Sequence, residues 1–276
     1  MKILTDTPSL YAPHQNSEEG LIVVPACTVL SDTAYRDIED ITTDDFLGRI
    51  RDGEIATSSQ PSIGDILEIF EKSEDDILVL PIGDGLSGTY QNMESAKKLT
   101  HNSERIHIID TCTLAGPQKY LVEKAIKLRD NGHSVEAIKE MLRDSIDSSL
   151  SFVIPSDFDF LKRSGRLTPF AAKIGTIMKI IPVMTLTEDK KKITKFCIKT
   201  SKKSALDAII EKLRDTNVGE GWLITVCHGG VENEALETVN TLRSIFGSSR
   251  FECHLLPPSL VCHGGPGCIL IQAVKL

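Results

Sequence analysis

The stretch Asp76–Gly88, with the sequence DILVLPIGDGLSG, decides the fold of this 276-residue chain. Its first part is a near-continuous apolar run, which predicts a parallel strand covered on both faces. The glycines that follow predict a tight turn, and residues 89–99 then have the pattern of a helix. A strand that leads through a turn into a helix is the repeating unit of a parallel α/β sheet.

The same alternation continues on both sides of this unit. Strands are predicted at 2–5, 21–29 and 105–109. Helices are predicted at 43–51, 62–72, 114–131 and 134–146, several of them preceded by a Ser or Thr that can cap the helix. We therefore predict an N-terminal domain built on a parallel α/β sheet.

The pattern changes near residue 150. Residues 181–187 and 193–198 flank a charged turn, EDKKK, and predict a hairpin. Further strands are predicted at 151–155, 222–227, 251–256 and 268–274, and helices at 169–180, 201–214 and 232–246. We predict an α+β second domain, with domain boundaries of 1–149 and 150–276.

Charge is divided unevenly between these halves. Residues 1–150 carry 14 Lys and Arg against 27 Asp and Glu, whereas residues 151–276 carry 17 against 12. Twelve basic and two acidic residues lie between Lys162 and Lys203. This segment predicts either a contact with an anionic partner or a solvated basic face. We do not expect nucleic acid, because the net charge is −8 and the basic segment lacks the interleaved aromatic residues that stack bases.

The sequence predicts neither a membrane-spanning helix nor a metal site. The longest apolar stretches, 21–30 and 268–274, fall short of the roughly 18 to 20 residues that a spanning helix needs. Asp6 interrupts the start before a signal peptide can form, so we expect a cytoplasmic protein. The seven cysteines include no Cys-x-x-Cys pair. We therefore expect no metal site, and buried reduced cysteines instead.

Residues 83–88 also match the G-x-G-x-x-G pattern of dinucleotide-binding turns. Asp110 ends the next predicted strand, where such a site places its ribose-binding acid. However, this is the third predicted strand rather than the first. A nucleotide-dependent enzyme that uses this loop and Asp110 is the alternative function. A hydrolase elbow is not predicted, because Thr89 replaces the second glycine of G-x-S-x-G.

Two more polar clusters stand out, TSSQPS at 57–62 and HGGPG at 263–267. The first combines several hydroxyls with a proline at a predicted loop-to-helix junction. Such hydroxyls either cap the helix or form a neutral cradle for a carboxylate or phosphate. The second predicts a tight turn that presents His263, which is either a structural or a functional histidine.

Taken together, these strings resemble the DegV family of bacterial fatty-acid-binding proteins. The matching strings occur in the order and at about the spacings of that family, and they extend over essentially the whole chain. They are ILTD at 3–6, SSQPS at 58–62, GLSGTYQ at 85–91, IDT at 109–111, KRSGR at 162–166 and HGGPG at 263–267.

The resemblance implies a two-domain protein that holds one long-chain fatty acid and has no complete catalytic site of its own. The carboxylate would lie at the domain junction and accept hydrogen bonds from Ser58, Ser59, Ser87 and Thr89, with His263 beside it. The acyl chain would occupy an apolar tunnel. The protein would then present the bound acid to a separate fatty acid kinase that uses ATP, and no cofactor besides the fatty acid is expected.

The tunnel wall and the docking surface are placed on the second domain. Wall candidates lie on the apolar segment 170–178 and the strand 180–186, although plain core is the alternative for each of them. The candidates are Phe170, Ile174, Ile177, Met178 and Ile180. For docking to the kinase, or transiently to an anionic membrane surface, we expect the basic residues Arg166, Lys190, Lys191 and Lys192.

The main departure from the family pattern lies in the turn before the helix at 89–99. Gly83-Asp84 stands where the preceding strand usually ends in Ser-Ser. A second carboxylate there would repel the carboxylate of a bound acid. We therefore expect either that the Asp84 side chain points away from the ligand or that the ligand differs from that of the family.

Overall fold

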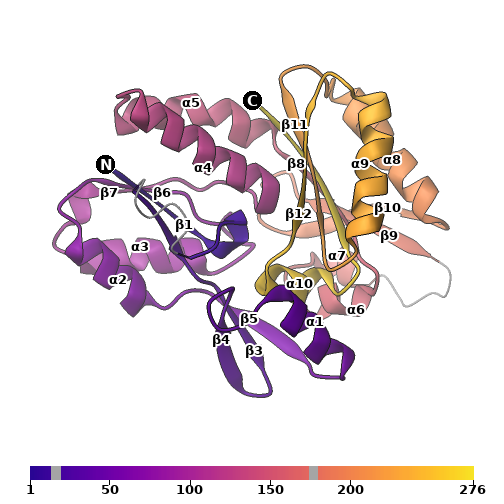
Figure 1. Cartoon of the computed structure of the whole chain (residues 1–276), viewed down its shortest axis with the longest axis horizontal. Coiled ribbons are helices and arrows are strands. Elements are labelled where there is room, and N and C mark those ends of the chain that lie inside the picture. The colour runs from indigo at the N-terminus through magenta and orange to yellow at the C-terminus, as the bar shows by residue number, and fades with distance from the viewer. Residues whose placement is uncertain (14–19, 174–179) are drawn as a thin grey trace.

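The computed structural model describes residues 1–13, 20–173 and 180–276. Its strands form three sheets of four, six and three strands. Figure 1 shows the four-stranded sheet with its helices beside the six-stranded sheet, and the small sheet at one end of the junction between them. No helix in the described ranges is long and apolar enough to cross a membrane.

The four-stranded sheet belongs to the N-terminal half and is parallel throughout, in the order β2-β1-β6-β7. Its strands are β1 (Lys2–Asp6), β2 (Leu21–Val24), β6 (Ile77–Val79) and β7 (Ile106–Ile108). Alternate side chains face opposite layers of helices, which is why these strands are apolar on both faces. The predicted parallel α/β sheet is therefore confirmed.

Ile3 and Leu78 pack against the helices on one face of that sheet, α4 (Ala115–Asp130) and α5 (Val135–Ser148). Leu4 and Val79 pack against those on the other face, α2 (Ile63–Lys72) and α3 (Thr89–Leu99). The predicted caps of two of these helices are present. The Ser62 side chain accepts from the Asp65 N–H at the start of α2, and the Ser134 side chain accepts from the Ala137 N–H at the start of α5.

The six-stranded sheet has the order β10-β9-β8-β13-β11-β12 and belongs wholly to residues after 149. Only β11 and β12 pair in parallel, and the other neighbours are antiparallel. This mixed sheet agrees with the predicted α+β class. The strands are β8 (Leu150–Ile154), β9 (Ile181–Leu186), β10 (Ile193–Lys199), β11 (Trp222–His228), β12 (Arg250–Leu255) and β13 (Ile269–Lys275).

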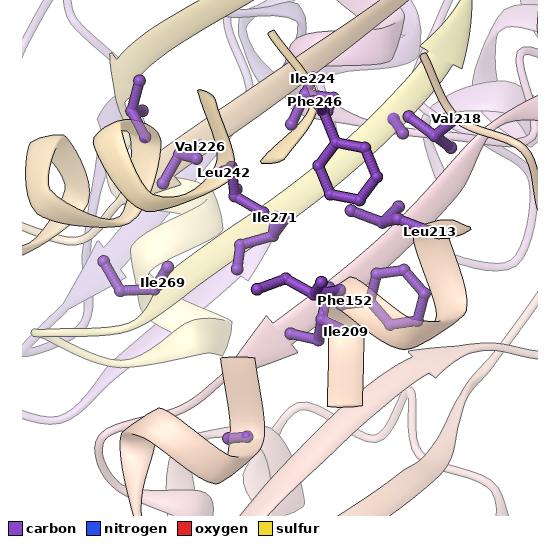
Figure 2. Close-up of a cluster of buried hydrophobic side chains, with 14 of the residues drawn as sticks. Phe152, Ile209, Leu213, Val218, Ile224, Val226, Leu242, Phe246, Ile269 and Ile271 are labelled. Atoms are coloured by element: carbon purple, nitrogen blue, oxygen red, sulfur yellow. The ribbon is translucent and has the colours of Figure 1, made fainter. Parts of the chain in front are cut away.

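One face of this sheet is covered by α8 (Lys202–Asp215) and α9 (Glu232–Ile245). Figure 2 shows Ile224 and Ile271 from the strands beside Leu242 from α9. The alternate residues of the same strands, such as Leu270 on β13, belong to a different cluster that includes residues of the N-terminal half. The second face of the sheet is therefore turned toward the junction of the two halves.

Several of the remaining elements lie at that junction. The small sheet has the order β4-β3-β5 and is antiparallel. Its strands are β3 (Cys27–Leu30), β4 (Thr33–Arg36) and β5 (Ala56–Ser59). The short helices are η1 (Thr7–Ser9), α1 (Thr43–Arg51), η3 (Ser103–Arg105), α6 (Phe158–Arg163), α7 (Pro169–Ala172) and α10 (Pro258–Gly264).

The predicted strand 21–29 is wrong in one respect, because the structure divides it into β2 and β3. These two strands belong to different sheets. Pro25 lies between them and has no N–H to donate to a ladder, so the chain leaves one sheet there and joins another. The predicted helix 169–180 is described only as α7, and residues 174–179 lie outside the described residues.

A close contact between α4 and β11 joins the two halves. Gly116 packs so tightly on β11 that an added Cβ would lie 2.1 Å from Thr225 Oγ1 and 2.5 Å from Thr225 Cβ. The Gly116 N–H also donates to Gln272 Oε1 at 3.2 Å. Only glycine fits this contact.

We expect Gly116→Ala to reduce the free energy of unfolding by about 1–3 kcal/mol, because the added methyl forces α4 away from β11. Gly48→Ala in α1 is the matched control, since nothing lies within 4 Å of its added Cβ. The control should be neutral or stabilising, because alanine favours a helix over glycine. Urea denaturation measures both, and equal effects of the two substitutions would contradict the close contact.

Candidate functional site

A cavity lies between the second face of the six-stranded sheet and the N-terminal half. Its volume is about 920 Å³, open space at its mouth included. A mainly apolar cavity with a few polar side chains is typical of a small-molecule binding site. Its wall is mainly apolar, and the aliphatic lining residues are Ile82, Leu86, Leu114, Val153, Leu161, Met184, Leu186, Ile193, Leu256, Leu260 and Leu270.

Several polar side chains also line this cavity and come from separate elements. Ser58 and Ser59 lie on β5, Ser87 lies in the turn before α3, and His263 lies in the last turn of α10. Ser58 Oγ and His263 Nε2 are 2.7 Å apart. The structure thus brings together four of the five residues expected to bind a carboxylate, although β5 is a strand rather than the predicted loop.

The loop that carries Ser87 is packed against the end of β5. An added Cβ at Gly88 would lie 3.0 Å from the side chain of Gln60, which directly follows that strand. Ser87 Oγ lies 2.9 Å from Thr89 Oγ1 and accepts from the Thr89 N–H at 3.3 Å. These contacts fix the Ser87 hydroxyl at the start of α3, where free backbone N–H groups favour an anion.

Thr89, the fifth of those residues, is fully buried and does not line the cavity. It lies behind Ser87, and its side chain is hydrogen-bonded to Asp6. Gln118 Nε2 donates to Asp6 Oδ1 at 2.7 Å, and the Ile82 N–H donates to the same carboxylate. Burial raises the pKa of Asp6 to about 7, against these hydrogen bonds, which lower it.

His263 is held as a neutral imidazole. Burial lowers its pKa to about 3, and the positive charge of Arg166 lowers it further. Arg166 itself lines the cavity, with its Nε donating to the Leu86 carbonyl at 3.3 Å. A neutral imidazole beside Ser58 offers one N–H donor and one acceptor, so the pair can orient a ligand without adding a charge.

We expect the difference in the free energy of unfolding between the wild type and His263→Gln to depend on pH. The advantage of the wild type should shrink as the pH falls from about 6.5 toward 3. The unfolded chain protonates its histidine near pH 6.5, whereas the folded chain resists protonation down to about pH 3. Denaturation of both proteins across this window measures the difference. A constant difference between them, or one that grows as the pH falls, would contradict a buried neutral imidazole.

The Asp84 side chain points away from the cavity, as expected. Lys191 Nζ lies 2.7 Å from Asp84 Oδ2, and Gln91 Nε2 donates to Asp84 Oδ1 at 3.0 Å. The hydrogen bond from Lys191 is the main reason that the pKa of Asp84 is lowered. Asp84 therefore ties the Gly83–Gly88 loop to the β9–β10 hairpin.

The groups that would bind a dinucleotide make contacts within the protein itself. Asp110 Oδ1 accepts from the Asp84 N–H at 3.0 Å and from the Cys112 N–H at 2.9 Å, so this carboxylate braces the glycine loop. An added Cβ at Gly85 would lie 2.5 Å from the Lys191 carbonyl, so that glycine faces protein rather than an open phosphate site. The structure does not favour the nucleotide alternative.

Of the tunnel-wall candidates, the two that the structure describes, Phe170 and Ile180, do not line the cavity. Phe170 is 65% exposed, and Lys195 Nζ lies 4.9 Å from its ring centroid. Ile180 is half-buried and does not line the cavity. Ile174, Ile177 and Met178 lie outside the described residues. The apolar pattern of residues 170–178 was interpreted as the wall of a ligand cavity. The ring of Phe170 instead contacts the ammonium group of Lys195 at the surface.

The candidate docking residues also differ in their surroundings. Lys190 Nζ donates to the Asp147 carbonyl at 2.9 Å and to Ser149 Oγ at 3.0 Å, at the end of α5. Lys191 is held by Asp84, Lys192 is exposed, and Arg166 lines the cavity. Two of the three consecutive lysines therefore join the halves of this chain.

Part of the cavity wall was not predicted from the sequence. Val153 and Leu270 are neighbours across β8 and β13, and both face the cavity. Their alternation with Phe152 and Ile271, which face the helices, was the available signal. Leu260 was also missed, because no element was predicted for residues 257–262, where most of α10 lies.

The fold and the site define an α/β architecture with two main sheets around an apolar cavity that has a hydroxyl-rich polar lining. The chain belongs to the DegV family, because the family model, described as an uncharacterised protein of the DegV family, matches residues 1–276. The DegV domain-containing protein YteA of Lactococcus lactis is 28% identical over 285 residues, covering 99% of this chain and 97% of that protein.

Solved structures show the same fold. A fatty-acid-binding DegV family protein from Thermus thermophilus superposes with a TM-score of 0.88 at 26% identity, covering 100% of this chain and 99% of that one. DegV of Bacillus subtilis, described as a fatty acid binding protein, superposes with a TM-score of 0.87 at 25% identity, with the same coverage. The resemblance noted from the sequence is therefore confirmed.

Proposed function

We propose that this protein binds one long-chain fatty acid in the cavity, with the carboxylate at Ser58, Ser59, Ser87 and His263. The observation that carries the proposal is the combination of a mainly aliphatic wall with the Ser58–His263 pair. The two related proteins that bind fatty acids have the same fold over their whole length. A carboxylate with an alkyl chain matches both parts of this lining.

The acyl chain supplies most of the affinity in this account. A buried chain of about 14 methylenes contributes at most ~11 kcal/mol at ~0.8 kcal/mol each. The serine hydroxyls and the neutral imidazole then orient the carboxylate without fully neutralising it. Arg166 is nearby, but its Nε donates to the Leu86 carbonyl and its Nη1 to the Ser164 carbonyl.

We propose further that the protein presents the bound acid to a separate kinase rather than reacting with it. A carboxylate held by neutral donors keeps an oxygen that can attack the γ-phosphorus of ATP, giving an acyl phosphate and ADP. The glycine loop of this chain is occupied by its own contacts, so the nucleotide would be held by the other protein. Of the four candidate docking residues, this proposal retains Arg166 and the exposed Lys192 as contacts for the kinase.

The test of binding uses delipidated protein titrated with oleate, with oleyl alcohol and with NAD. Tight binding of oleate, weaker binding of the alcohol and no thermal stabilisation by NAD are expected. Stabilisation by NAD without binding of oleate would contradict the proposal. The kinase step is tested by trapping acyl phosphate with hydroxylamine when the loaded protein meets a fatty acid kinase and ATP.

A further inference from the structure

Asp37 is a fully buried carboxylate directly behind the polar part of the cavity wall. It follows β4 and is fixed by its own backbone, because its N–H donates to the Ala26 carbonyl at 2.8 Å. Ala26 and Ser259, on either side of this carboxylate, both line the cavity. The carboxylate itself is not among the lining groups.

Three hydrogen bonds converge on this carboxylate from three elements. Thr28 Oγ1, on β3, donates to Asp37 Oδ1 at 3.0 Å. The Ser259 N–H, in the first turn of α10, donates to Oδ2 at 3.1 Å. Thr7 Oγ1, in η1, lies 3.5 Å from the same oxygen. Thr7 and Thr28 are also fully buried, so water does not replace these contacts.

The two shorter of these bonds lead directly to the Ser58–His263 pair. Thr28 is the cross-strand neighbour of Ser58 in the β3–β5 ladder, and the side chains of such a pair lie on the same face. Ser259 lies four residues before His263 on α10, and residues at this spacing share a face of the helix. Asp37 therefore contacts β3, which pairs with the strand of Ser58, and α10, which carries His263.

We propose that Asp37 is a positioning residue that holds β3 and α10 together so that Ser58 and His263 meet at the cavity. This inference deepens the proposed function and rests on it, since the pair is the part of the site that would receive the fatty-acid carboxylate. Asp37 does not touch the ligand. It acts because its two oxygens can accept from a strand side chain and a helix N–H at the same time.

Substitution by asparagine gives the clearest test. Asp37→Asn keeps the shape but replaces one acceptor oxygen by an NH₂ donor, which must face either the Thr28 hydroxyl or the Ser259 N–H. Thr28→Val removes one of the three bonds with little change of volume and serves as a second variant. Asp144→Asn is the matched control, because Asp144 is a surface carboxylate that pairs with Lys275 at 2.7 Å.

The first readout is the ¹⁵N NMR signal of the His263 ring in protein free of fatty acid. In the wild type and in Asp144→Asn at pH 8, where Asp37 is ionised, His263 should show a single hydrogen-bonded tautomer. In Asp37→Asn and Thr28→Val, the signal should shift toward that of a free imidazole. Unchanged His263 signals in both variants would overturn the proposal, whether or not the protein binds a fatty acid.

The second readout is a double-mutant cycle of oleate affinity at pH 8. Asp37→Asn and Ser58→Ala should each weaken binding about tenfold, and the double variant should be little weaker than either one, because both act on the same pair. Ile209→Val, on the buried face of α8, controls for lost stability and should leave affinity unchanged. A double variant that is about a hundredfold weaker would overturn the proposal. Absence of oleate binding in the wild type would instead refute the proposed function.

Discussion

Val153→Trp is expected to reduce the affinity for a long-chain fatty acid at least a hundredfold while the protein remains folded. Val153 lies on β8 in the middle of the six-stranded sheet, and its side chain lines the cavity. An indole at this position would occupy volume needed by the acyl chain. Because each excluded methylene forfeits ~0.8 kcal/mol of burial, loss of a few of them already weakens binding by this factor.

The control for this substitution is Leu206→Trp. Leu206 lines a separate groove between α8 and α9, on the opposite face of the same sheet. Both variants gain an indole, but only the first fills the cavity. Oleate titration and circular dichroism measure affinity and fold. Wild-type affinity in a folded Val153→Trp protein would show that the fatty acid does not bind where this account places it.

His263→Ala is expected to weaken fatty-acid binding by 10- to 100-fold and to remove most of the preference for the acid over the corresponding alcohol. The imidazole is within hydrogen-bonding distance of Ser58, so its loss frees the Ser58 hydroxyl and removes a neutral donor near the carboxylate. A hydrogen bond to a charged group is worth about 1.5–3 kcal/mol, which corresponds to this range of affinity.

His254→Ala is the matched control, because His254 lies on β12 and contacts Glu252 at 2.7 Å rather than the cavity. It should bind oleate and oleyl alcohol as the wild type does. If His263→Ala weakened both ligands equally, the imidazole would support the wall of the cavity rather than the carboxylate.

The regular parts of the fold were predictable because their patterns are local. The parallel strands of the N-terminal half are continuous apolar runs, and their helices begin at recognisable caps such as Ser62 and Ser134. The β3–β5 pairing was not predictable in the same way. It joins Thr28 to Ser58 across thirty positions of the chain, and the polar segment of β5 is not apolar enough to identify a strand.

The residues of the site were likewise predictable only in part. Resemblance to a family identified Ser58, Ser87 and His263, which the structure brings to one cavity. It did not identify Asp37, which contributes through contacts among three elements that are distant in sequence. Phe170 was predicted to line the cavity but contacts Lys195 instead. An apolar segment near a basic one has the same composition in either case.

The most direct test of the central claim is organic extraction of the purified, denatured protein followed by mass spectrometry, before and after incubation of delipidated protein with oleate. The account predicts one long-chain fatty acid per chain in the wild type and in Leu206→Trp, and far less than one in Val153→Trp. Failure of the delipidated wild type to retain oleate, or retention of equal amounts by Val153→Trp, would contradict it.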